Sequence, residues 1–331
     1  MRRILIDQEV KERVEEYVGV MTMNQPQKVN WKMDEMPRER LLAFFHFLWG
    51  HHHYDEGRYV YAILFLYNEL LALKPEYFNI VYESFFKQWD RVLNVIIDYD
   101  GNKKEFYKHV LNCMRYKDIR SGLMRQYMKD QKIKACVYCN AQYAVTTEEF
   151  VEKEIKKRIG TYQFDHFKAE SLYPFLCTSY YNLQPSCPAC NNSKALNDSF
   201  FNLYTTKAED QDVFWFELTP DKVIEDYLEK DMGVLEVKLN SEDKNLLKNH
   251  QDRFHIDMIY EQHLDVVEEL IVKMRAFSKC NQTATEESLA ELFPNGVEDP
   301  ERFFFGYYMD KEHVHSRPLS KLAQDVVGMF K

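Results

Sequence analysis

The amino-acid sequence predicts an α+β fold in which most of the chain is α-helical. Apolar residues recur at three- and four-residue spacing through residues 38–130, which is the period of amphipathic helices. Two C-x2-C pairs then border a short module that has β-strand character. Beyond the module, residues 212–218 and 234–239 alternate apolar and polar side chains, which predicts a short C-terminal β-hairpin.

The length and composition indicate a folded chain with a sizeable core. Of the 331 residues, 45% are hydrophobic and 15% are aromatic. Disordered segments bury too little apolar surface to offset the loss of chain entropy, so this composition argues against disorder. A chain of this length forms one large domain or two to three smaller ones. We expect a helical region over residues 1–130, a cysteine-bordered module over 131–205 and an α+β region over 206–331.

The first region carries the helical pattern in four segments. These segments are residues 38–49, 58–73, 76–98 and 104–117. Pro37 and Pro75 stand where helices begin, because proline is favoured at the first helical position. The sequence "DYDG" (98–101) marks a helix stop. We interpret "HHHYDE" (51–56) as a turn between two helices rather than a metal site, because adjacent histidines on a helix point in different directions.

The last region adds helices to the hairpin. A helical pattern covers about residues 241–279 and is broken near 253–257, and the tail is helical again over 317–330. No segment of the chain repeats.

The sequence favours a cytoplasmic protein that does not enter a membrane. The start, "MRRILIDQEVKERVEE", lacks the apolar core of a signal peptide. No uninterrupted apolar stretch reaches 18 residues, and the most apolar segment (59–73) is broken by Asn68 and Glu69.

Charge is distributed unevenly along the chain. The formal net charge is −10. Residues 101–134 nevertheless hold ten basic and three acidic residues, whereas residues 201–331 hold 15 basic and 27 acidic residues. The basic stretch directly precedes the first cysteine pair. Its pattern is compatible with a solvated helix face and with a nucleic-acid-binding surface, and both interpretations stay open here.

The cysteine spacing predicts a structural zinc site. Two C-x2-C pairs supply four thiolates, the number that a tetrahedral Zn²⁺ site requires. The predicted zinc ligands are Cys136, Cys139, Cys187 and Cys190. The three other cysteines, which we expect to be small core residues, are Cys113, Cys177 and Cys280.

The 47 residues between the two cysteine pairs contain further polar residues of interest. The segment 161–167 has strand character and carries Asp165 and His166 at its end. The segment 181–186 is suited to be the returning strand. The segment 187–196, "CPACNNSKAL", then predicts a helix that starts at the second cysteine pair. The zinc ion would join the front of this hairpin to the start of the helix.

In this module the sequence resembles the HNH nucleases, the ββα-metal family. The matching residues are Asp165-His166, Asn182-Leu183, Cys187-x-x-Cys190-Asn191 and Lys194. The match covers about 60 of the 331 residues. The sequence departs from many members of that family by having Asn191 where they have a third histidine, which makes it an HNN version of the pattern.

The residue types are suited to hydrolysis of a phosphodiester bond. His166, with an ordinary histidine pKa near 6.5, would take a proton from water, so cleavage would rise with pH through six to seven. Asp165 and Asn191 offer hard oxygen ligands for a catalytic Mg²⁺ or Mn²⁺. Asn182 is expected to fix the loop that carries His166. Lys194 is expected on the same helix face as Asn191, within reach of a phosphate.

A wider resemblance implies a biological setting. The stretch from Asp165 to Lys194, with "RPLSK" (317–321), resembles the PtuB-type HNH nucleases of Septu-like anti-phage systems. The resemblance implies a nucleic-acid substrate, DNA rather than RNA, with tRNA still open. It also implies an ATPase partner of the PtuA type, which the acidic region 206–331 would dock. The chain has no G-x-x-x-x-G-K-[ST] motif, so ATP use would belong to that partner.

Two other functional classes fit the same residues. One is a non-catalytic zinc protein that binds nucleic acid through the basic stretch 101–134. The other is an interaction subunit whose zinc module only docks a partner. Divalent-dependent cleavage, and its loss when His166 is replaced, separates the nuclease from both.

Overall fold

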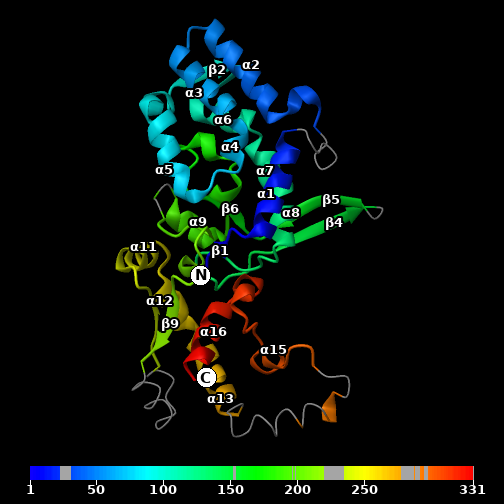
Figure 1. The fold of residues 1–331 in the computed structure, drawn as a ribbon, viewed down its shortest axis with the longest axis vertical. Helices are drawn as coiled ribbons and strands as arrows, with labels where there is room; N and C mark the ends of the chain where they lie inside the picture. Colours follow the sequence, from blue (N-terminus) through cyan, green and yellow to red (C-terminus); the bar gives the residue numbers. More distant parts are fainter. Residues whose placement is uncertain are drawn as a thin grey trace.

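The structure, a computed structural model, combines helices with small two-stranded sheets, in agreement with the mixed class predicted from the sequence (Figure 1). The structure describes residues 1–22, 31–151, 154–195, 197, 199–219, 235–276, 287, 291–293 and 297–330, and of residues 151–157 no side chain is described.

The N-terminal part is helical, as the spacing of its apolar residues predicts. Its α-helices are α1 (Gln8–Met21), α2 (Pro37–Gly50), α3 (Tyr54–Phe65), α4 (Tyr67–Leu71), α5 (Phe78–Val81), α6 (Phe106–Cys113), α7 (Tyr116–Ser121) and α8 (Leu123–Asp130). Pro37 begins α2, as expected. Arg115 has a positive φ of 55° and separates α6 from α7, so the segment 104–117 is not one helix.

The segment 76–98 is not one helix either. After α5 the chain continues as a π-helical turn (Tyr82–Phe86) and a 3-10 segment (Lys87–Val92). It then forms an antiparallel hairpin of β2 (Ile96–Tyr99) and β3 (Asn102–Glu105). The connecting residues Asp100 and Gly101 have φ of 55° and 70°. A two-residue hairpin turn of this kind needs positive φ at both positions, which Asp-Gly supplies. The "DYDG" sequence is therefore a hairpin turn.

The histidine run forms a turn between α2 and α3, which confirms that interpretation. His51 caps the end of α2, and His52 has a φ of 64°. The ring of His51 contacts the Phe47 carbonyl, whereas that of His52 contacts the Tyr54 hydroxyl. The three rings have different partners and do not converge on one point.

The module has the strand, strand, helix order that the sequence predicts. Strand β6 (Gln163–His166) pairs antiparallel with β7 (Leu183–Ser186), and α9 (Pro188–Lys194) follows. An additional antiparallel hairpin, β4 (Thr146–Val151) and β5 (Glu154–Gly160), lies between the first cysteine pair and β6. It projects sideways from the middle of the molecule in Figure 1. The sequence analysis did not predict this hairpin.

The C-terminal part contains the predicted β-hairpin and helices. The hairpin consists of β9 (Trp215–Leu218) and β10 (Val237–Asn240), which pair antiparallel. The helices are α11 (Lys244–Phe254), α12 (Ile256–Tyr260), α13 (Leu264–Ala276), α15 (Pro300–Phe305) and α16 (Ser320–Met329). The expected break near 253–257 is confirmed, because His255 has a φ of 50° and separates α11 from α12.

Buried apolar side chains from all three parts belong to one hydrophobic cluster. Strand β1 (Ile4–Leu5) pairs in parallel with β8 (Tyr204–Thr205), so residues about 200 positions apart lie side by side. The hydroxyl of Tyr17 on α1 donates to the Thr178 carbonyl at 2.6 Å. Cys113 and Cys177 are buried in this core, as expected, and Cys280 lies outside the described residues.

No helix in the described parts of the chain has both the length and the apolar character needed to cross a membrane.

We predict that His250 makes the fold sensitive to acid. Burial lowers the pKa of His250 to about 3, and its ring contacts the Tyr138 carbonyl. Below about pH 6.5 the unfolded chain gains a proton that the folded chain excludes, so the free energy of unfolding falls as the pH drops. From pH 7 to 5 this one group lowers it by about 2 kcal/mol. Urea unfolding at both pH values measures the difference.

His250→Gln removes the titrating ring, and its unfolding free energy should change less between pH 7 and 5 than that of the unchanged protein. His46→Gln, at an exposed position, is the matched control and should keep the full pH dependence. Equal pH dependence in all three proteins would contradict the assignment.

Candidate metal centre and catalytic site

The two cysteine pairs meet at one point in the structure. The sulfur atoms of Cys136, Cys139, Cys187 and Cys190 all lie within 4.8 Å of one another, and all four residues are buried. Four sulfurs bound to one tetrahedral Zn²⁺ at about 2.3 Å would be about 3.8 Å apart. The four cysteines could therefore hold a metal ion such as zinc.

The ionisation of the thiols also favours a cation at this point. Burial raises the pKa of Cys136, and hydrogen bonds with the neighbouring thiols raise that of Cys190. Hydrogen bonds with the same thiols lower the pKa values of Cys139 and Cys187. Four buried thiolates repel one another, so they ionise together only if a positive ion compensates their charge.

The backbone around the first pair is shaped for this convergence. Asn140 has a φ of 53° and donates its backbone N–H to the Cys136 carbonyl at 2.8 Å, which closes a tight turn. The Val137 N–H donates to the Pro185 carbonyl on β7 at 3.2 Å. The second pair begins α9, because Cys187 is the N-cap residue and accepts from the Cys190 N–H at 3.5 Å.

Residues far along the chain hold this turn in place. The Asn140 side chain donates to the Val314 carbonyl and accepts from the Lys321 N–H, both at 2.9 Å. The Leu319 N–H donates to the Asn140 carbonyl. The Tyr260 hydroxyl donates to the Cys139 carbonyl at 2.8 Å. The "RPLSK" segment is therefore part of the scaffold of the cysteine cluster.

His166 is buried beside the cysteine module, and its two ring nitrogens have different partners. Nε2 lies 3.0 Å from the Cys177 carbonyl. A carbonyl only accepts, so Nε2 carries a proton, and in the neutral ring the lone pair is on Nδ1. Nδ1 lies 3.4 Å from a carboxylate oxygen of Glu170. The centroid of the Tyr116 ring, on α7, lies 4.6 Å from the centroid of the His166 imidazole.

Burial changes the acid–base behaviour of His166. It lowers the pKa of His166 to about 4, although the hydrogen bond to Cys177 acts in the opposite direction. The ring is therefore neutral at pH 7. The expectation based on the ordinary pKa of 6.5 is wrong for this environment.

Asp165 lies on the other face of β6, because successive side chains of a strand alternate. Its carboxylate accepts from the Tyr138 hydroxyl and from the Lys194 ammonium, the latter at 3.2 Å. Lys194 also donates to the His166 carbonyl at 2.7 Å. Burial raises the pKa of Asp165, and the charge of Lys194 opposes this shift.

Asn191 and Lys194 occupy the same face of α9, three residues apart, and this face covers β6. The Asn191 amide nitrogen donates to Gln163 Oε1 at 2.6 Å, two residues before Asp165 on the strand. Its amide oxygen accepts no hydrogen bond from another described residue. No recorded contact joins Asn191 to Asp165. One carboxylate and one available amide oxygen are donors of the kind that Mg²⁺ or Mn²⁺ takes, with water completing the shell.

Asn182 has a purely local arrangement. Its side-chain oxygen accepts from the Lys168 N–H at 2.8 Å, and its amide donates to the Lys168 and Leu176 carbonyls at 3.2 and 3.0 Å. These bonds fix the loop after His166, which is the structural role expected for it.

The sequence analysis missed several residues that contact the site. Glu170, Tyr116, Tyr138 and Gln163 were not singled out. Glu170 stands four residues after His166 and Tyr138 lies inside the first C-x2-C, so their positions in the sequence carried some signal. Tyr116 comes from the helical region and carried none.

No protein-family model, curated protein or solved structure matches this chain.

We predict that Cys187→Ser removes the metal and loosens the module. The change deletes one of four thiolates but leaves a hydroxyl that can still cap α9. The binding energy of a structural zinc site is largely folding energy. Elemental analysis should find about one zinc per chain in the unchanged protein and almost none in the variant. Hydrogen exchange should increase over residues 136–195.

Cys113→Ser is the control, because Cys113 is equally buried but lies outside the cluster. It should keep the zinc. Well-folded, unchanged protein without zinc would refute the metal centre.

Proposed function

We propose that this protein is a metal-dependent endonuclease of the HNH type, which hydrolyses phosphodiester bonds in nucleic acid. The observation that carries the proposal is the state of His166. Its Nε2–H is committed to the Cys177 carbonyl and its burial keeps the ring neutral, so Nδ1 is available as a base at pH 7. The order of strand, strand and helix around it supports the same interpretation.

In the proposed reaction, Nδ1 of His166 accepts a proton from a water molecule while the water oxygen attacks phosphorus. The bond from phosphorus to the 3′ oxygen breaks, and that oxygen takes a proton from solvent. The products carry 5′-phosphate and 3′-hydroxyl ends. The Cys177 carbonyl holds the ring orientation throughout and stabilises the imidazolium that forms.

Asp165 and Asn191 would hold the divalent cation, Mg²⁺ or Mn²⁺. When bound, such an ion supplies positive charge that stabilises the developing negative charge on phosphate. Lys194 is the cation that contacts Asp165 in the structure, and its charge opposes the rise that burial causes in the pKa of this carboxylate. Asn182 keeps the loop after His166 in place.

The wider setting is part of the proposal and rests on the resemblance alone. DNA is the preferred substrate over RNA, and the context is anti-phage defence with an ATPase partner in the cytoplasm. The contacts of Val314, Leu319 and Lys321 with Asn140 mean that deleting the C-terminal part would also disturb the cysteine cluster. Point substitutions on its surface are therefore the better test of partner docking.

We predict that His166→Ala loses cleavage while keeping zinc and fold. Loss of a general base costs on the order of a hundredfold or more in rate. The assay follows plasmid DNA and total RNA with Mg²⁺, with Mn²⁺ or with EDTA. His109→Ala is the matched control, because His109 is also buried with Nε2 3.0 Å from a carbonyl, that of Ile97.

The control should cleave at the unchanged rate per folded molecule. If purified His166→Ala cleaves as fast as the control, His166 is not the general base. Absence of cleavage in the unchanged protein with every metal would favour the non-catalytic zinc-protein alternatives.

We predict a second effect at the proposed divalent site. Asp165→Asn keeps the shape and the contact with Tyr138 but removes the charge, so half-maximal cleavage should need about tenfold more Mn²⁺ or higher. Asp325→Asn is the control, because Asp325 is also a carboxylate paired with a buried lysine, Lys321, at 2.6 Å. Titration of Mn²⁺ with both folded variants measures the difference. Equal metal requirements would contradict the role of Asp165.

A further inference from the structure

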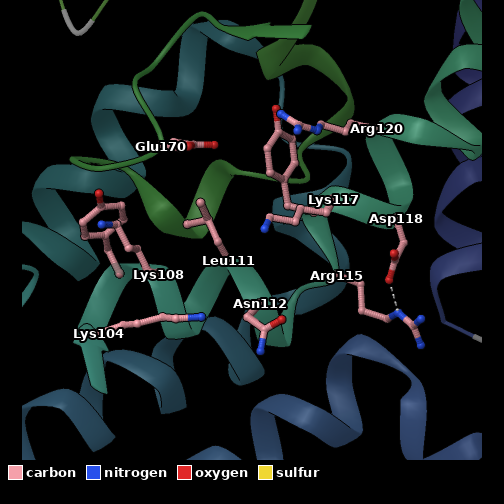
Figure 2. Close-up of a pocket in the computed structure, with 11 residues that line it drawn as sticks. Lys104, Lys108, Leu111, Asn112, Arg115, Lys117, Asp118, Arg120 and Glu170 are labelled. Carbon is pink, nitrogen blue, oxygen red and sulfur yellow. Dashed lines mark hydrogen bonds and ion pairs between the residues drawn. The ribbon is translucent and has the colours of Figure 1, made fainter. Parts of the chain in front are cut away.

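A cavity of about 480 Å³ lies beside His166 and is lined mainly by the basic part of the chain (Figure 2). Its walls come from β3, α6, α7 and the loop after β6. The charged residues that line it are Lys104, Lys108, Arg115, Lys117, Asp118, Arg120 and Glu170. The cavity therefore has five basic and two acidic side chains.

Three of the basic groups form no ion pair with a carboxylate, although the charge of Arg120 opposes the rise that burial causes in the pKa of Glu170. Lys108 pairs with Glu105 at 2.9 Å, and Arg115 pairs with Asp118 at 2.7 Å. The other three, Lys104, Lys117 and Arg120, form no ion pair with any residue that the structure describes. In Figure 2, Lys104 and Lys117 extend into the same space from two sides. The charges of Lys104 and Lys117 attract an anion to this cavity, although the net charge of the whole protein is −10.

The cavity adjoins the proposed catalytic base. Glu170 lines the cavity and lies 3.4 Å from His166 Nδ1. Tyr116 also lines it, and its ring contacts the imidazole on one side. The Arg120 guanidinium lies 5.3 Å from the centroid of the Tyr116 ring. The side chains of Glu170 and Tyr116 therefore lie between the basic groups of the cavity and His166 Nδ1, the nitrogen that would activate water.

We propose that this cavity binds a phosphate group of the nucleic-acid strand, next to the bond that is cleaved. Lys104 and Lys117 would contact the phosphate oxygens, with Arg120 at the side nearest His166. Lysine and arginine are the side chains that proteins use to bind phosphate. This proposal rests on the proposed function, because it takes nucleic acid as the ligand.

The basic stretch 101–134 does not form one continuous surface around this cavity. Of the lysines at the end of that stretch, Lys129 pairs with Glu148 and Lys132 lies at a separate cavity with Arg2 and Arg13. None of these lines the cavity beside His166. We therefore interpret Lys129 as part of a solvated helix face. We interpret Lys104, Lys117 and Arg120 as part of the nucleic-acid-binding surface.

The test compares two double variants with the same loss of charge. Lys104→Ala with Lys117→Ala removes two cavity lysines. Lys103→Ala with Lys11→Ala is the control: Lys103 is the strand neighbour of Lys104 on the opposite face of β3, and Lys11 is exposed on α1. The probes are fluorescein-labelled 20-nucleotide DNA and RNA, single-stranded and duplex, each with and without a 5′-phosphate. Anisotropy is measured in EDTA, where a metal-dependent nuclease cannot cleave the probe.

The cavity variant should bind at least one of these probes about tenfold more weakly than the control near 50 mM salt. The slope of its log affinity against log salt concentration should be shallower, by the amount expected for the loss of about one to two charge contacts. A loss seen only with 5′-phosphorylated probes identifies a terminal phosphate as the ligand. A loss independent of the 5′-phosphate identifies a backbone phosphate. Equal binding by the two double variants overturns the proposal.

Failure of the cavity proposal can be distinguished from failure of the proposed nuclease function. His166→Ala should bind the probes normally, because it leaves the cavity charges in place. If His166→Ala loses cleavage but the cavity variant binds like its control, only the cavity assignment fails. If His166→Ala cleaves normally but the cavity variant loses binding, the cavity assignment stands and the catalytic one fails.

Discussion

The meeting of four buried cysteine sulfurs within 4.8 Å of one another is the constraint on which the site depends. Helix α9 has only seven residues, and a helix of that length is not stable by itself in water. Cys187 caps it, and the cluster joins its first turn to the turn at residues 136–140. The positions of Asn191 and Lys194 relative to β6 therefore depend on the cysteine cluster.

Positively charged side chains lie on both sides of β6. On one side, Asp165 and Lys194 form a buried ion pair, which is costly to desolvate and strongly destabilising if one partner is removed. On the other side, neutral His166 lies between the Cys177 carbonyl and Glu170, with the basic cavity beyond. A single four-residue strand thus separates a buried ion pair from a neutral histidine and the cavity beyond it. Adjacent residues in the sequence, Asp165 and His166, serve opposite sides of the site.

Sequence reasoning succeeded where the signal was local and failed where it was distant. The C-x2-C spacing predicted the cluster, the strand character of 161–167 predicted β6 with β7 as the returning strand, and alternation predicted the β9–β10 hairpin. Asp100-Gly101 was itself a hairpin signal, but the long apolar pattern before it dominated the interpretation. The pairing of β1 with β8, across about 200 residues, has no local signature. The cavity also joins α6 and α7 to Glu170 through tertiary packing, which spacing along the chain does not encode.

The hydrogen bonds between Asn140 and residues 314–321 have a consequence for biosynthesis. Asn140 and Lys321 are 181 positions apart, so the first cysteine pair leaves the ribosome long before its backbone partners. The four cysteines are all present once residue 190 has emerged, and a nascent chain could bind zinc at that stage. The carbonyl and side chain of Asn140 would still be hydrated rather than paired. Translation would therefore produce the cysteine module first, before residues 314–321 are present to support the turn at Asn140.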